Sequence, residues 1–276
     1  MYDDVLLATD GSEVASDAAA VGISLARTLN ATVHAVSVVK SSRGDGTNRE
    51  RREADAEAVA SEARNAGCAA ETVVRNGRPA TEIRRYAEEA DVDLIVVGTH
   101  GRTGLKQVVL GSVALEVIRD ARRPVLSVSA TVARNGVKGG IDDVCLATDG
   151  WSGTAAATEH ALDIADACDA QLHALYAVDV ASGDDEIRGR FEEHGKETTA
   201  AVANRAGDRG LEATRSVASG SAHEVILEYT EAEDIDLLVM GTESKSNLER
   251  LVVGSVSQRV VPNASVPVLT VRTLGP

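Results

Sequence analysis

Short runs of aliphatic and β-branched residues alternate, in the first half of the chain, with segments whose apolar residues recur at helical spacing. The runs predict strands at residues 4–9, 32–39, 71–75, 94–98 and 125–128. Between the first two runs, Ser12 would cap a helix whose apolar face consists of Val14, Ala18, Val21, Leu25 and Leu29. Further helical patterns cover 49–66, which Gly67 ends, and also 79–90 and 112–121.

This alternation predicts an α/β domain with a doubly wound, five-stranded parallel sheet of strand order 3-2-1-4-5. In such a sheet, ligands bind beyond the carboxyl ends of the strands at the point where the winding direction reverses. That point lies between strands one and four. The loops that leave these two strands are therefore the expected location of any binding site.

The second half of the chain repeats the first. Four blocks return in the same order: DDVLLATDG (3–11) as DDVCLATDG (142–150), DLIVVGT (93–99) as DLLVMGT (236–242), VVLGSV (108–113) as LVVGSV (251–256), and PVLSV (124–128) as PVLTV (267–271). The first block returns after 139 residues and the others after 143, so the second copy has four extra residues in its middle, where an acidic helical region is expected near 185–206. We predict two domains of one kind, 1–130 and 141–276, and a flexible linker at 131–140.

The charge balance bears on the expected partners. The formal net charge is −15, and only five of the 28 basic residues are lysines, which favours a halophilic source over an ordinary acidic protein. No broad basic face is available, so a nucleic-acid partner is disfavoured. The first residues are acidic and no apolar run approaches the ~18 residues of a membrane span, so we expect a cytoplasmic protein without a membrane partner.

The loop after strand one carries a carboxylate. It reads Ala8-Thr9-Asp10-Gly11-Ser12. Asp10 is a candidate ligand for Mg²⁺ or for a ribose hydroxyl. The simpler interpretation is a turn residue whose side chain accepts hydrogen bonds from nearby backbone N–H groups.

The loop after strand four carries a glycine pattern, G-x2-G-x9-G-S, formed by Gly98, Gly101, Gly111 and Ser112. Glycines allow the backbone to approach phosphate oxygens closely, and the N–H groups at a helix start attract negative charge. Three further side chains of this loop are candidate phosphate partners: His100, Arg102 and Lys106. The alternative is that the glycines only form a tight turn.

This loop pattern, together with an Asp at the end of strand one, resembles the ATP-binding subgroup of the universal stress protein family, over essentially the whole chain and twice. The resemblance implies ATP with Mg²⁺ or Mn²⁺ as ligand, with Asp10 near the metal, ribose and phosphates, and with adenine bound by the backbone of Val38. The implied phosphate cradle consists of Gly98, Gly101, Gly111, Ser112 and Val113, and the implied binding set also includes Ala8, Thr9, His100 and Arg102. The end of strand two departs from the family pattern, because it reads VSVVK where an acidic residue is usual.

Members of this family pair through their last strands. The resemblance therefore implies that PVLSV and PVLTV pair within this chain as a fused pseudo-dimer, which would also cover two sheet edges. A higher homo-oligomer is left open.

The two copies differ at the expected phosphate site. In the second copy Ser244 replaces the second glycine and Glu243 adds a negative charge, although the loop keeps the basic residues Lys245 and Arg250. The rest of the pattern is retained by Asp149, Gly241, Gly254 and Ser255. Residues 1–138 carry 18 Lys and Arg against 19 Asp and Glu, whereas residues 139–276 carry 10 against 24. We therefore expect the first copy to bind ATP well and the second weakly or not at all. The alternative is that the Ser244 hydroxyl replaces the lost glycine contact.

Three classes of function follow. The first is an ATP-binding stress-response or signalling protein without catalytic residues. The second is a slow ATPase or nucleotidyl transferase, which is disfavoured because neither loop offers a nucleophile with an adjacent base. The third is a dimerisation scaffold that binds no nucleotide. Several conspicuous residues are interpreted as structural: the charged run 49–53 as a solvated helix face, and His34, His173, Tyr86 and Tyr229 as packing residues.

Overall fold

The computed structural model describes residues 2–40, 46–99, 110–135, 140–151, 154–180, 185–242 and 254–272. The chain divides into two compact units, Met1–Gly139 and Gly140–Pro276, which are called the first and second domain here.

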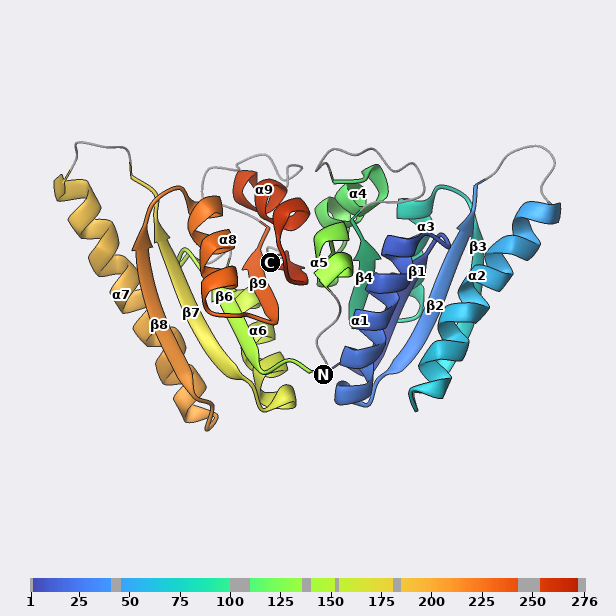
Figure 1. The fold of residues 1–276 in the computed structure, drawn as a ribbon, viewed down its shortest axis with the longest axis horizontal. Coiled ribbons are helices and arrows are strands. Elements are labelled where there is room, and N and C mark those ends of the chain that lie inside the picture. Colours follow the sequence, from blue (N-terminus) through green and yellow to red (C-terminus); the bar gives the residue numbers. More distant parts are fainter. Residues whose placement is uncertain are drawn as a thin grey trace. The chain divides into compact units, whose positions relative to one another are not determined.

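The first domain alternates strands and helices as its sequence pattern predicts (Figure 1). Its strands lie in the order β3-β2-β1-β4-β5, and the neighbours are parallel, which confirms the predicted topology. The elements are β1 (Asp4–Thr9), α1 (Glu13–Leu29), β2 (Thr32–Val39), α2 (Gly46–Asn65), β3 (Ala70–Asn76), α3 (Pro79–Glu89), β4 (Leu94–Gly98), α4 (Ser112–Asp120), β5 (Val125–Val128) and α5 (Ala130–Asn135).

The second domain repeats this topology with the order β8-β7-β6-β9-β10. The elements are β6 (Asp143–Ala147), α6 (Ala155–Cys168), β7 (Gln171–Val178), α7 (Asp185–Asp208), β8 (Ala213–Ser219), α8 (Ala222–Ala232), β9 (Leu237–Gly241), α9 (Ser255–Asn263) and β10 (Val268–Val271). The four extra residues of this copy lie within its second helix, because α7 has 24 residues where α2 has 20. They lengthen the helix by about one turn.

Local signals explain most of these boundaries. The Ser12 hydroxyl accepts a hydrogen bond from the backbone N–H of Ala15 at 3.3 Å and caps α1 as predicted. Apart from the partly exposed outer strands β3 and β8, the strands of both sheets are mostly apolar, because helices cover a parallel sheet on both faces. Their fully buried side chains include Leu6, Leu7, Leu94, Ile95, Leu126, Leu146, Leu172 and Leu175.

The segment between the domains departs from expectation. We predicted a flexible linker at 131–140, but residues Ala130–Asn135 form the short helix α5. Helix α5 contacts α1, and Val132 is buried. Small residues such as Ala and Val are compatible with a helix as well as with a linker, so composition alone did not separate the two. The pairing of the last strands stays a prediction.

Candidate functional site

A cavity of about 330 Å³ lies at the carboxyl ends of the strands in the first domain, between β1 and β4. This first cavity is at the predicted switch point of the sheet. Eight of the residues proposed from the sequence line it: Ala8, Thr9, Asp10, Val38, Gly98, Gly111, Ser112 and Val113. The other three, His100, Gly101 and Arg102, lie outside the described residues.

The loop after β1 has a tight conformation that accounts for its glycine. The Asp10 carboxylate accepts a hydrogen bond from the Ser12 N–H at 3.1 Å, so the turn role expected of this residue is present beside its place in the cavity wall. Gly11 has a φ of +69°. A Cβ at this position would lie 2.3 Å from Oδ1 of Asp55, a residue of α2. The loop therefore packs directly against α2.

The start of α4 forms the opposite wall. Gly111 is its N-cap residue and donates its N–H to the Thr99 carbonyl at 2.7 Å. Its φ of −60° is open to any residue, so the backbone strain of a left-handed conformation does not explain this glycine. The first turn of a helix has no intrahelical acceptors for its N–H groups, and no side chain caps α4. These N–H groups and the helix dipole favour an anion beside Ser112 and Val113.

Two basic side chains also line the first cavity, and sequence reasoning did not assign either to the site. They are Lys40, directly after β2, and Arg52 on α2. The Arg52 side chain is 13% exposed, and its Nη1 donates to the Asp10 carbonyl at 2.5 Å and to Oδ2 of Asp55 at 3.0 Å. Arg52 thus joins α2 to the loop after β1.

The position of Arg52 corrects the interpretation of the run 49–53 as a solvated face. Arg49 and Glu53 are about half exposed and form an i,i+4 ion pair at 2.9 Å, as that interpretation requires. Arg52 lies on a different face of the helix, toward β1. Its i,i+3 spacing to Asp55 was a usable signal, because such a pair can hold a long side chain in one direction.

Val38 lies where a base could meet backbone atoms. The parallel ladder between β1 and β2 ends at the pair Thr9 and Ser37. Val38 is one residue beyond this ladder, lines the cavity, and remains paired with Arg75 of β3.

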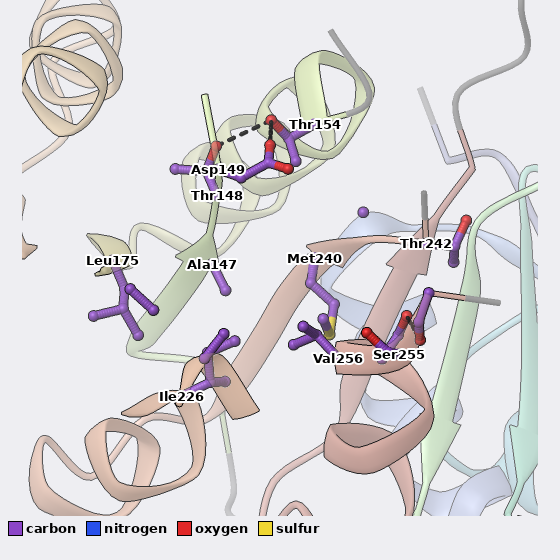
Figure 2. A pocket seen from close by; sticks show the side chains of 15 residues that line it. Ala147, Thr148, Asp149, Thr154, Leu175, Ile226, Met240, Thr242, Ser255 and Val256 are labelled. Carbon is purple, nitrogen blue, oxygen red and sulfur yellow. Dashed lines mark hydrogen bonds between the residues drawn. The ribbon is translucent and has the colours of Figure 1, made fainter. Parts of the chain in front are cut away.

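The second domain has a cavity at the equivalent place, with a volume of about 120 Å³. Figure 2 shows this second cavity, which extends from Thr148 and Asp149 after β6 to Ser255 and Val256 at the start of α9. Fifteen residues line it, and each is the repeat equivalent, 139 or 143 positions later, of a residue that lines the first cavity. The first cavity has three additional lining residues, and these are Lys40, Asn48 and Arg52.

At the opposite, amino-terminal ends of the strands, both domains bury a histidine between two polar side chains. His34 Nδ1 lies 2.8 Å from the Tyr86 hydroxyl, and its Nε2 lies 2.8 Å from an Asp4 carboxylate oxygen. Burial raises the pKa of Tyr86, so the phenol stays protonated. The second domain repeats this arrangement with His173, Tyr229 and Asp143. These groups hold β1, β2 and α3 together far from the cavity, in agreement with a structural role.

The described residues contain no cluster of three or more His, Cys, Asp or Glu side chains that could hold a metal ion. None of their helices is long and apolar enough to cross a membrane.

Comparison with known proteins gives a consistent result. The model of the universal stress protein family matches the chain twice, at residues 1–129 and 140–272. A universal stress protein of Methanocaldococcus jannaschii is 36% identical over 137 residues, which is 47% of this chain and 81% of that protein. One of Thermus aquaticus is 38% identical over 136 residues, 46% of this chain and 99% of that protein. The crystal structure of an Archaeoglobus fulgidus universal stress protein superposes with a TM-score of 0.75 at 21% identity, covering 99% of this chain and 97% of that one.

Proposed function

The chain belongs to the universal stress protein family, with one family domain in each half, and from this premise we propose that its first domain binds ATP in the first cavity. The observation that carries this proposal is the pair of basic side chains, Lys40 and Arg52, beside the uncapped start of α4. Two cations and a helix N-terminus around one cavity favour a ligand with several negative charges.

The remaining lining residues suit the other parts of the nucleotide. Val38 offers its backbone beyond the β1 ladder to the edge of the base, and Ile83 and Val97 provide apolar surface beside it. Asp10 is placed to meet the ribose or a divalent cation. Mg²⁺ commonly takes only one or two protein carboxylates and completes its shell with water and phosphate oxygens, so a single carboxylate fits it.

We propose that the protein uses the bound nucleotide to control its conformation or partners in a cytoplasmic stress response, and that it is not an enzyme. Within the described part of the first cavity, the ionisable side chains are Asp10, Lys40 and Arg52. The Asp10 carboxylate already accepts a backbone hydrogen bond. Steady ATP turnover with Mg²⁺ would instead favour the enzyme class.

Calorimetry tests the proposal. Titration of the full chain with ATP and Mg²⁺ should show one site per chain. Ala8→Leu should abolish binding, because it fills the first cavity, whereas the matched variant Ala147→Leu fills only the second cavity and should leave binding intact. Mass spectrometry of small molecules released from the denatured protein gives an independent test. Absence of ATP binding, or two equivalent sites per chain, would contradict the proposal.

A further inference from the structure

We propose that the second cavity is a separate site for an uncharged nucleoside, represented by adenosine, and that it does not accept the nucleotide's phosphates. The choice of a nucleoside rests on the proposed function of the first cavity, because the two cavities share fifteen lining positions. The requirement for an uncharged ligand rests on what the second domain has at the remaining positions.

The position of Lys40 is occupied by an acid. Its repeat equivalent is Asp179, whose carboxylate accepts a hydrogen bond from the N–H of Ala222, the first residue of α8, at 3.1 Å. In the first domain the equivalent of Ala222 is Pro79, which has no N–H. The start of α3 therefore does not need an acceptor at position 40, and a lysine can stand there. The second domain therefore satisfies this helix start with its own carboxylate and repels an added anion.

In the second domain, the space that corresponds to Arg52 is occupied by the aromatic ring of Tyr176, a residue of β7. The repeat equivalent of Arg52 is Gly195, and a Cβ at Gly195 would lie 2.7 Å from the Tyr176 ring. Tyr176 is the equivalent of Ser37, a buried residue small enough to leave space for Arg52 in the first domain. Burial, and to a smaller extent the Asp149 carboxylate, raise the pKa of Tyr176, so this phenol remains neutral.

The second cavity is consequently small and mostly apolar. Among its described lining residues there is no Lys or Arg, and Asp149 is the acidic one. Figure 2 shows Leu175, Ile226, Met240 and Val256 extending into this region from β7, α8, β9 and α9. Leu175 and Met240 are larger than their equivalents in the first domain, which are both valines. A cavity near 120 Å³ is close to the ~150 Å³ that accommodates a benzene-sized molecule, so it suits a base.

Polar groups at the mouth of the second cavity are suited to a sugar. Asp149 accepts hydrogen bonds from the Trp151 N–H at 3.1 Å and the Thr154 hydroxyl at 3.4 Å, which orient its carboxylate. Thr148 adds a hydroxyl group beside Asp149, and Ser255 adds one from the opposite wall. Ribose hydroxyls can both donate to a carboxylate and accept from a hydroxyl.

The chain contains its own reporter for this site. Trp151 is its single tryptophan, is 37% exposed, and lies two residues after Asp149 with its ring stacked on His194 at a centroid distance of 5.1 Å. We expect adenosine to change the Trp151 fluorescence of the full chain in a saturable manner. ATP should require a concentration at least about tenfold higher for the same change, because the described lining of the cavity has no Lys or Arg to offset the charge of the phosphates.

Matched variants assign the signal. Ala147→Leu should remove the adenosine response, and Ala8→Leu should retain it while losing the calorimetric ATP site. Ala177→Leu provides a second way to fill the second cavity if Ala147→Leu folds poorly by circular dichroism. An ATP response of Trp151 as tight as that of adenosine, or no adenosine response at all, would overturn the inference. If adenosine binds but calorimetry finds no ATP site, the proposed function of the first cavity fails and this inference stands.

Discussion

The two cavities of this chain occupy the same place in the same topology, and the first has three lining residues that the second lacks. Fifteen lining positions are shared, including the β1 and β6 loops and the starts of α4 and α9, whereas Lys40, Asn48 and Arg52 line only the first. The sheet therefore determines where a ligand binds, because its switch point is a property of strand order. In our proposal, the ligand charge that each cavity accepts depends separately on the residue that follows β2 and on a residue of α2, which are Lys40 and Arg52 in the first domain.

Each of these two charged residues is accompanied by a second residue that also differs between the two domains. Arg52 requires a small residue at Ser37, and Gly195 accompanies the large ring of Tyr176. Lys40 accompanies Pro79, and Asp179 accompanies the N–H of Ala222. A side chain added at Gly195 alone would clash with the Tyr176 ring. Loss of Asp179 alone would remove the side-chain acceptor of the Ala222 N–H.

Removal of Lys40 and Arg52, the two basic side chains in the described lining of the first cavity, should have the largest effect. In the double variant Lys40→Asp/Arg52→Gly, these two positions of the first domain carry the residues that the second domain has at the equivalent positions. Hydrogen bonds to charged groups contribute about 1.5–3 kcal/mol each, so ATP affinity should fall by about 100-fold or more. Adenosine affinity should change little. Calorimetry with both ligands measures this, and Arg49→Gly, on the exposed side of the same helix, is the control. Equal losses for both ligands would show that Arg52 only supports the fold.

The reverse exchange should have a smaller effect. Tyr176→Ser/Gly195→Arg removes the aromatic ring and places an arginine at the equivalent of Arg52. One new charge-assisted contact should improve ATP binding to the second cavity by roughly tenfold, as reported by Trp151 fluorescence. Tyr176→Ser alone is the control, since it opens the space without adding charge. If ATP binds the double variant no more tightly than this control, the missing arginine does not account for weak ATP binding in the second cavity.

Substitutions at the other end of the strands should not distinguish the domains. Tyr86→Phe and Tyr229→Phe each remove a hydroxyl that bonds a buried histidine, so each should lower the free energy of unfolding by about 1–2 kcal/mol. Neither should alter ligand affinity. Urea unfolding and calorimetry of the two variants give the comparison, and a change in ATP affinity in either would mean that the two ends of the sheet are coupled.

The last expected effect is the pH dependence of the second domain. Burial raises the pKa of Tyr229 to about 12, whereas an unfolded tyrosine ionises near 10. Between these values the unfolded state binds fewer protons, so stability is fully present below about pH 10 and declines as the pH rises toward 12. Unfolding followed by Trp151 fluorescence should show this decline, and Tyr229→Phe should reduce it. An unchanged decline in the variant would assign it to other groups.

Local patterns were sufficient for much of this protein. The strand and helix periods, the Ser12 cap and the repeated blocks predicted the topology of both domains, since each signal lies within a few neighbouring residues. Eight proposed site residues line the first cavity for the same reason, because they lie near the ends of strands at the switch point or at the start of α4.

What the sequence by itself determined is thus the fold, its duplication, and the edge of the sheet where a cavity would form. Only the tertiary structure decided which side chains complete each cavity. Arg52 lies within a run of charges and looks solvated until α2 packs against the loop after β1, where it meets Asp10 and Asp55. Tyr176 occupies the corresponding space in the second domain although it is 19 residues from Gly195. Periodicity identifies the buried face of an element, but contacts between elements depend on how they pack, and the chemistry of both cavities depends on those contacts.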